Sequence, residues 1–139
     1  MSAANIPGEY RDLFEKRSFA FVATLLPDGA PHVTPTWVDF DGEHVLINTV
    51  AGNRKDRNIQ ADPRVALAVA DPENPYRYLS VQGEVVDRRT DDAREHLDRL
   101  AERYTGQARY PGPGGQDRVV LVIRPDRVSG QSPPARGER

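Results

Sequence analysis

Short apolar runs separated by turn residues dominate the pattern of hydrophobic and polar positions along the chain. Six runs have the length and composition of β-strands, at residues 19–26, 32–40, 44–49, 64–70, 76–88 and 118–123. Pro-Asp-Gly at 27–29 and Asp-Gly at 41–42 provide the residue types that tight turns require, so the first three strands are predicted to form an antiparallel meander. The last run is continuously apolar, which predicts burial on both faces.

Helical spacing of apolar residues occurs in three places. It predicts a short helix from residue 6 to about residue 16, a second over residues 54–61 that stops before Pro63, and a third from an N-cap at Thr90 to Gly106. His96 falls on the polar side of the third helix, where we expect it at the surface. Arg88 and Arg89, just before that helix, are expected to form a solvated strand end.

Strands joined by hairpins and flanked by short helices define a mainly β (α+β) fold. Six strands favour a closed or partly open antiparallel barrel with helices packed outside it. Pro35 cannot donate to a neighbouring strand, so its strand is expected at an edge, a bulge or a ligand mouth, whereas Gly83 marks a bend or a close approach. The length of 139 residues predicts one domain over residues 6–130, with a loose start at 1–5 and a disordered tail at 131–139.

The composition narrows the class of protein. Hydrophobic residues make up 37% of the chain, and 12 Pro and 11 Gly favour many turns, so a core completed by dimerisation is expected. A net charge of −2 argues against a general nucleic-acid binder. The absence of cysteine excludes thiolate metal sites, and the three histidines are not spaced as metal ligands, so no metal site is predicted. With no apolar run long enough for a membrane span and no signal-peptide core, we expect a cytoplasmic protein. Residues 107–116, rich in Gly and Pro, are a candidate lid or interface segment.

The residues that suggest a ligand-binding site lie at 48–58, in the stretch N-T-V-A-G-N-R-K-D-R-N. Gly52 can turn the chain with a positive φ, and the helix that follows would aim unpaired backbone N–H groups and the positive end of its dipole at the turn. Arg54 and Lys55 add full positive charges there, and this combination suits a phosphate. The alternative is a solvated basic turn, and the residues alone leave both interpretations open.

Three segments resemble the flavin- and deazaflavin-binding split β-barrel family, the pyridoxamine 5′-phosphate oxidase-like superfamily. They are F-V-A-T-L-L-P-D-G-A-P-H-V-T-P-T-W-V-D-F-D-G at 21–42, N-T-V-A-G-N-R-K-D-R-N-I-Q-A-D-P-R-V-A at 48–66, and D-P-E-N-P-Y-R-Y-L-S-V-Q-G-E-V at 71–85. The chain looks most like the small actinobacterial members that use coenzyme F420, a deazaflavin. The resemblance implies a six-stranded antiparallel split β-barrel and a homodimer with cofactor sites at its interface.

The same resemblance implies which residues bind the cofactor. They are His32, Val33, Thr34, Pro35, Trp37, Asn48, Thr49, Asn53, Arg54, Lys55, Asn58 and Tyr78. Arg54 and Lys55 would hold the phosphate, residues 48–49 would touch the ring or ribityl chain, and residues 32–37 would line the ring plane. Trp37 as a core or interface aromatic remains an alternative. Tyr78 shares a strand face with Tyr76 near the expected dimer interface, where packing is an equal alternative.

The function implied is hydride transfer from reduced coenzyme F420 to a conjugated, electron-poor small molecule. The alternatives are an FMN-dependent oxidoreductase of the same fold and a non-enzymatic carrier of a flavin-like ligand. F420 has an additional anionic tail, for which Arg57, Arg64 and Arg77 form a candidate basic track. Tyr76, Tyr78 and His32 are the candidate side-chain proton donors, and solvent could serve equally well, so no catalytic residue is assigned.

Two further expectations follow from the resemblance. The chain ends in I-R-P-D-R-V-S-G-Q without the arginine-rich substrate signature of true pyridoxamine phosphate oxidases, so that reaction is not expected. Lys55→Ala is expected to weaken cofactor binding by about 1.5–3 kcal/mol, the loss of a charged hydrogen bond.

Overall fold

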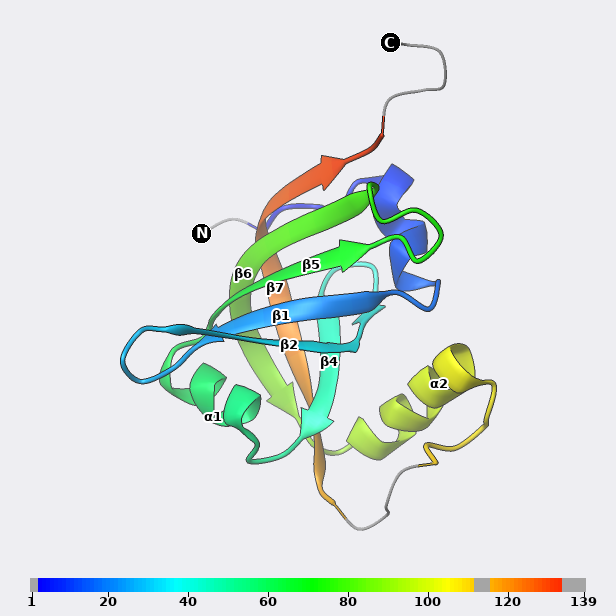
Figure 1. The fold of residues 1–139 in the computed structure, drawn as a ribbon. Helices are drawn as coiled ribbons and strands as arrows, with labels where there is room; N and C mark the ends of the chain where they lie inside the picture. The colour runs from blue at the N-terminus through cyan, green and yellow to red at the C-terminus, as the bar shows by residue number, and fades with distance from the viewer. Residues whose placement is uncertain (1–2, 112–115, 134–139) are drawn as a thin grey trace.

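The computed structural model describes residues 3–111 and 116–133. The elements in chain order are η1 (Gly8–Phe14), β1 (Phe19–Leu25), β2 (Pro31–Trp37), β3 (Asp39–Phe40), β4 (Val45–Val50), α1 (Arg54–Ala61), β5 (Arg64–Ala70), β6 (Tyr78–Arg89), α2 (Ala93–Thr105) and β7 (Arg118–Gln131). The strands form one antiparallel sheet of order β2-β1-β5-β6-β7-β4-β3 (Figure 1). The mainly β fold with short flanking helices is confirmed.

The strand order explains why the sheet is curled. β2 and β3 are consecutive in the chain but lie at opposite edges of the sheet. Val38 alone separates them, and such a short linker spans only about 7 Å. The two edges therefore have to approach each other at this end, and the sheet curls into the half-closed barrel seen in Figure 1. The split β-barrel expected from the resemblance is confirmed.

The structure has seven strands rather than the six predicted, because the run at residues 32–40 is divided at Val38. The Val38 backbone N–H donates to Tyr104 Oη at 3.1 Å, and its carbonyl accepts from Arg103 Nη1 at 2.9 Å. Helix α2 thus takes the hydrogen bonds that a neighbouring strand would make. The predicted meander holds only in part: β1 pairs with β2, and residues 39–40 pair with β4, but β2 itself does not pair with β4, whose longer partner is β7.

The barrel interior is filled by the inward faces of the long strands. Val22, Leu67 and Val81 are buried and follow one another across β1, β5 and β6. Residues 119–123 of β7 are all buried, as their continuous apolar pattern predicted. At Gly83 an added Cβ would lie 2.0 Å from the carbonyl oxygen of Arg124, so the close approach of β6 and β7 requires glycine.

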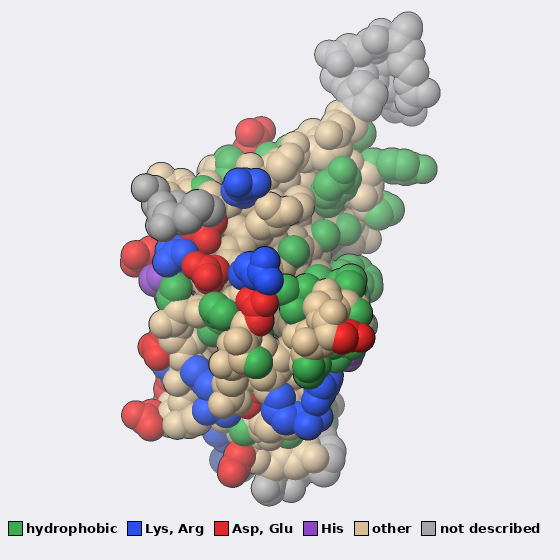
Figure 2. Space-filling view, turned by 90° about the vertical axis from the view of Figure 1, so that its left-hand side faces the viewer, with side chains coloured by type: hydrophobic (Ala, Val, Ile, Leu, Met, Phe, Trp, Pro, Cys, Tyr) green, Lys and Arg blue, Asp and Glu red, His purple; other side chains and the backbone are tan. Residues whose placement is uncertain are grey.

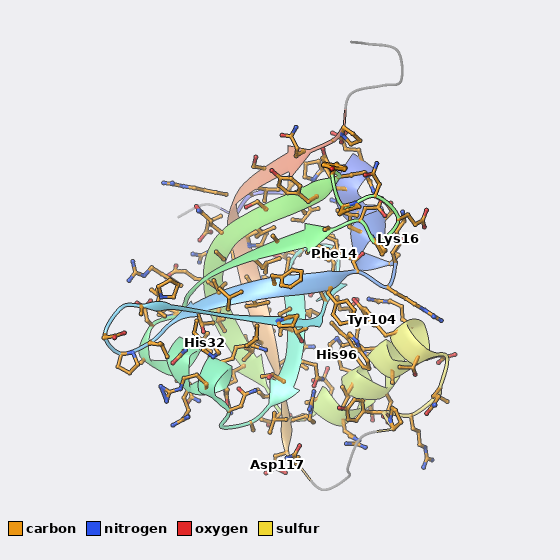
Figure 3. All side chains as sticks on the ribbon, viewed as in Figure 1. Phe14, Lys16, His32, His96, Tyr104 and Asp117 are labelled. Carbon is orange, nitrogen blue, oxygen red and sulfur yellow. The ribbon has the colours of Figure 1, made fainter. Side chains whose placement is uncertain are left out.

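The helices begin and end close to the predicted positions. η1 is a 3₁₀ helix, α1 covers residues 54–61 as predicted, and α2 ends at Gly106 with φ 81°. The N-cap of α2 is Asp92 rather than Thr90. The prediction of an exposed His96 is wrong: the side chain is fully buried, because it lies between Ala93 and Leu100 on the helix face that packs on the sheet (Figure 3).

The outer face of β1 and β2 carries exposed apolar side chains. Phe19 and Phe21 are each 50% exposed and Val33 is 57% exposed. The strand register places Trp37 beside Phe19 and Pro35 beside Phe21 on this face. Figure 2 shows hydrophobic side chains gathered along the right-hand flank of that view. Apolar patches of this kind are typical of a surface that another molecule covers.

Residues 1–2, 112–115 and 134–139 lie outside the described residues. They include parts of the expected loose start, of the candidate lid at 107–116 and of the expected tail. Within the described ranges, no helix is long and apolar enough to cross a membrane.

Candidate functional site

The turn between β4 and α1 is held by side-chain hydrogen bonds. Asn53 is the N-cap of α1: its Oδ1 accepts from the Asp56 backbone N–H at 3.0 Å, and its Nδ2 donates to Thr49 Oγ1 at 2.7 Å. Gly52 has φ 83°, in the left-handed region that favours glycine. The remaining N–H groups of the first turn and the helix dipole therefore point into the space before α1.

An ion pair between a buried carboxylate and an exposed arginine anchors this turn to the sheet. The fully buried Asp56 carboxylate accepts from Arg88 Nε at 2.8 Å and Nη2 at 2.7 Å, and from the Gly52 backbone N–H at 2.8 Å. The hydrogen bonds from Arg88 outweigh burial and lower the pKa of Asp56. Arg88 is itself solvent-exposed, as predicted for a strand end, with 34% of its side chain accessible. Its ion pair with Asp56 was not predicted, because only the tertiary structure brings the end of β6 beside α1.

Lys55 is a buried cation, with 7% of its surface exposed. It has no hydrogen bond or ion pair with any residue in the described part of the chain. Burial, and then the nearby charge of Arg118, lower the pKa of Lys55. A solvated turn does not account for this side chain. A buried charge without a carboxylate beside it favours an anion supplied from outside the chain.

Arg118, at the start of β7, is a site residue that the sequence analysis missed. Its Nε donates to Asn48 Oδ1 at 2.9 Å, and its guanidinium lies 5.5 Å from the Tyr110 ring centroid. It makes no ion pair with the described residues, and burial lowers its pKa. Lys55 and Arg118 are therefore two neighbouring cations from different elements. The only sequence signal was a charged residue at the head of an otherwise apolar strand.

One face of β2 continues the site toward α1. The strand register pairs His32 with Thr24, whose Oγ1 accepts from Asn58 Nδ2 of α1 at 3.0 Å. His32 and Thr34 share this face, and Figure 3 shows His32 on the α1 side of β2. His32 Nδ1 and Thr34 Oγ1 are buried without a partner among the described residues. Such atoms indicate a place where a polar ligand would complete the hydrogen bonds.

A hollow of about 210 Å³ opens beside Arg118. Its lining residues are Phe19, Pro35, Thr36, Trp37, Asn48, Leu97, Leu100, Tyr110 and Arg118. Trp37 stacks on Tyr104 with ring centroids 4.9 Å apart and meets Tyr110 edge-on at 5.9 Å. The hollow thus combines flat aromatic walls with one cation, which suits a planar ring that carries an anionic group.

A second hollow, of about 320 Å³, lies between the β1–β2 turn and α1. Arg54 and Arg57 line it together with Asn58, Pro27 and Gly29. Lys and Arg side chains also gather over the lower part of the face in Figure 2, where α1 lies. This basic hollow adjoins the N-terminal turn of α1, so it extends the anion-attracting surface beyond Lys55.

Other predicted residues lie elsewhere in the fold. Val33 points to the outer face of β2, whereas Pro35, on the same face, lines the hollow beside Arg118. Tyr78, 39% exposed, is the first residue of β6, whereas Arg88, near the other end, contacts α1. Ten residues of strand span roughly 30 Å, so one chain alone does not bring Tyr78 to this site.

Two of the three arginines considered for binding the F420 tail form ion pairs elsewhere in the fold. Arg77 is held by Asp12 at 2.7 Å and by Asp71 at 2.9 Å, and Arg64 pairs with Asp62 at 2.8 Å. Arg57, in contrast, lines the hollow beside α1 and remains a candidate for binding the tail.

The donor set of the site fits an organic anion. Backbone N–H groups, Lys55 and Arg118 offer only hydrogen-bond donors and positive charge. No three His, Cys, Asp or Glu side chains cluster as metal ligands would within residues 3–111 and 116–133. A curled antiparallel sheet with a cationic helix N-terminus beside it defines this chain as a split β-barrel with a candidate anion site.

Comparison with known proteins identifies the family. The model of the pyridoxamine 5′-phosphate oxidase family matches residues 6–132, and the chain belongs to that family. This confirms the resemblance drawn from the three sequence segments. No curated protein matches the chain significantly.

Solved structures agree with the family. A structure described as an F420 reductase is 40% identical, with a TM-score of 0.79, and the match covers 89% of this chain and 98% of that one. A conserved hypothetical protein from Mycobacterium tuberculosis is 26% identical with a TM-score of 0.68, covering 93% and 86%. HupZ from Group A Streptococcus, 22% identical with a TM-score of 0.67 and coverage of 90% and 93%, shares the fold.

Proposed function

We propose that this protein binds coenzyme F420 and transfers a hydride from its reduced form to a conjugated, electron-poor small molecule. The coarser conclusion is an oxidoreductase with a flavin or deazaflavin cofactor, supported by the family and by the similarity to an F420 reductase. The observation that carries the proposal is the convergence of two cations beside an aromatic hollow, the buried Lys55 and the half-buried Arg118, neither with a carboxylate partner in the described chain.

The residues of the site would divide the work of binding. Lys55, Arg54 and the first turn of α1 would hold the phosphate, with Asn53 and Asn58 fixing the geometry of that turn. His32 and Thr34 would offer the cofactor hydrogen bonds on the α1 side of β2 through their unpartnered atoms. Trp37 and Arg118 would border the ring, and Asn48 and Thr49 support Arg118 and Asn53 from β4. When bound, the reduced deazaflavin supplies the hydride from C5.

The basic hollow favours F420 over FMN. FMN needs one phosphate site, whereas F420 has an anionic lactyl–glutamate tail beyond its phosphate. Arg54 and Arg57 line a hollow next to the phosphate site, and neither forms an ion pair with another described residue. They would attract the tail. FMN binding is the second candidate, because a single phosphate site would be enough for it and other proteins of this fold use FMN.

A second copy of the chain is the proposed partner. The exposed apolar strip of Phe19, Phe21 and Val33 adjoins Pro35 and Trp37, so a partner seated there would also cover the ring site. Phe21→Glu would place a charge in this face. We expect a dimer by sedimentation velocity for the wild type and a monomer with weaker cofactor binding for the variant. A wild-type monomer would refute the proposed partner.

The sole tryptophan provides the decisive experiment. Trp37 lines the ring hollow, so its fluorescence should fall as a ring binds there. Titrations with F420 and with FMN are made in parallel. Micromolar or tighter binding of F420 alone is expected, followed by turnover of reduced F420 with an enone acceptor. Preference for FMN would favour the second candidate, binding without any turnover would indicate a carrier, and binding of neither would refute the cofactor assignment.

A further inference from the structure

A buried hydrogen-bond chain runs from Arg118 to the far side of α2. Asn48 Oδ1 accepts from Arg118 Nε at 2.9 Å, and Asn48 Nδ2 lies 3.1 Å from His96 Nδ1. His96 Nε2 lies 3.0 Å from Asp39 Oδ2, and Asp39 Oδ1 accepts from Arg103 Nη2 at 2.8 Å. The chain joins β7, β4, α2 and β3. His96 is fully buried.

Two unambiguous partners fix the orientation of the Asn48 amide. The carbonyl oxygen of Ala93 can only accept, and it lies 2.8 Å from Nδ2. The guanidinium of Arg118 can only donate, so the atom beside it must be Oδ1. A reversed amide would set two donors against each other at Arg118 and two acceptors at Ala93. Asn48 therefore presents an N–H to His96.

This orientation determines the tautomer of His96. Because Asn48 donates to Nδ1, that nitrogen has to be the acceptor, and the ring proton sits on Nε2. Nε2–H then donates to Asp39. Burial by itself would raise the pKa of Asp39, but hydrogen bonds from His96 and Arg103 outweigh it and keep that pKa well below its ordinary value. Asp39 stays ionised and fixes the ring in this one state.

We propose that His96, oriented by Asp39, is a positioning residue for cofactor binding: it holds the amide of Asn48 so that Asn48 aims the Arg118 guanidinium into the ring hollow. Only Nε of Arg118 is used by the described residues, so its four terminal N–H groups stay available to the hollow. The proposal rests on the proposed function, because it assigns Arg118 to an anionic group of the bound ring compound.

Two substitutions separate positioning from structural support. His96→Asn keeps an acceptor where Nδ1 was and loses the reach to Asp39, whereas His96→Gln keeps a donor toward Asp39 and loses the acceptor for Asn48. If His96 acts through Asn48, His96→Asn should bind F420 within about twofold of wild type. His96→Gln should bind about tenfold more weakly, since one directed hydrogen bond is at stake. If His96 serves only to tie α2 to β3 through Asp39, the order of the two variants is reversed.

A second readout does not depend on the cofactor. In the protein without ligand, the Arg118 Nε–H signal in ¹⁵N–¹H spectra, identified by its loss in Arg118→Lys, reports directly on the bond to Asn48. We expect its hydrogen exchange to be slow in wild type and His96→Asn and at least tenfold faster in His96→Gln. Unchanged exchange in His96→Gln would overturn the proposal. If wild type binds neither F420 nor FMN, the proposed function fails while this measurement still decides the hydrogen-bond chain.

Folding of the variants is checked by thermal unfolding. If His96→Gln does not fold, Asn48→Leu removes the link with a side chain of similar volume. The same acceleration of Arg118 exchange is then expected, and its absence would overturn the proposal.

Discussion

We expect Lys55 to destabilise the protein without ligand and to strengthen cofactor binding. Replacing it with methionine tests both effects. Lys55→Met keeps an unbranched apolar stem in the same buried space and removes the charge. Lys55 is 7% exposed with no carboxylate partner among the described residues, and Arg118 adds a second positive charge nearby. The protein without ligand therefore carries the cost of a buried, unpaired cation. The variant should be more stable and should bind the cofactor less tightly.

The two effects have opposite signs and similar size. Loss of a charge-assisted contact to a phosphate should weaken binding by about 1.5–3 kcal/mol, or roughly 10–150-fold. Removal of the buried charge should raise the free energy of unfolding by about 0.5–2 kcal/mol. A change of about 1 kcal/mol corresponds to about 4 °C in Tm for a chain of this size.

The pH dependence provides a further check on Lys55. Its pKa in the folded protein is lowered from the ordinary 10.5, so the unfolded chain binds the extra proton between the two values. The wild type therefore gains stability as the pH rises through the folded pKa toward 10.5, and the variant lacks this gain.

The assay pairs thermal unfolding without ligand with the Trp37 fluorescence titration. Arg99→Met is the matched control, because it removes one positive charge from an exposed position on α2. It should change neither quantity appreciably. If Lys55→Met bound the cofactor as tightly as wild type, Lys55 would not hold the phosphate. If the variant were less stable than wild type, the assumption of an unpaired buried charge would be wrong.

Three further substitutions test the frame that holds the site. Arg88→Met leaves the Asp56 carboxylate buried and unpaired, so the free energy of unfolding should fall by about 3–5 kcal/mol in urea titrations. Asp56→Asn in the same background should recover part of the lost stability. If no stability is recovered, Arg88 acts by packing alone. Because Arg88 lowers the pKa of Asp56, the stabilisation is present above the unfolded value of 3.8 and is lost as the pH falls below it, which unfolding curves from pH 6 to pH 2 would show. Gly83→Ala should cost at least about 3 kcal/mol or prevent folding, since its Cβ meets the Arg124 carbonyl at 2.0 Å, and near-wild-type stability would show that β6 and β7 can separate there. Tyr104→Phe should lower stability by about 1–3 kcal/mol, because the hydroxyl that accepts from the Val38 N–H and donates to the Ser18 carbonyl is lost; an unchanged midpoint would argue that water replaces it.

Local patterns were sufficient for most of the elements. Residues 54–61 form a helix as predicted, because Asn53 caps it and Pro63 stops it within a few residues. The turn at 27–29 forms with Gly29 at φ 87°, and Asp41 organises the next turn by accepting from two backbone N–H groups. In these places the signal and the structure that it specifies lie within a few residues of each other.

The errors share one physical origin. Val38 leaves its strand because Tyr104 and Arg103, more than 60 positions away, take its hydrogen bonds. His96 was assigned to the surface because it is polar, yet it is buried beside Asn48 of β4. Arg88 is exposed as expected, but its buried partner Asp56 lies in another element and was missed. A polar side chain is buried when such a partner is present, and the partner is invisible in a local pattern.

The sequence by itself determined the strands, the turns, the cationic helix start and the family, since these depend on residue type and on short spacings. Only the tertiary structure decided that Lys55 is buried, that Arg118 joins it, and that His96 reaches Arg118 through Asn48. The strand order brings β7 next to β4 and places α2 against both. It therefore decides that Arg118 lies close to Lys55 in a region shielded from water. Burial and charge proximity are properties of that arrangement, and they are the reason why the basic segment before α1 is a candidate cofactor site.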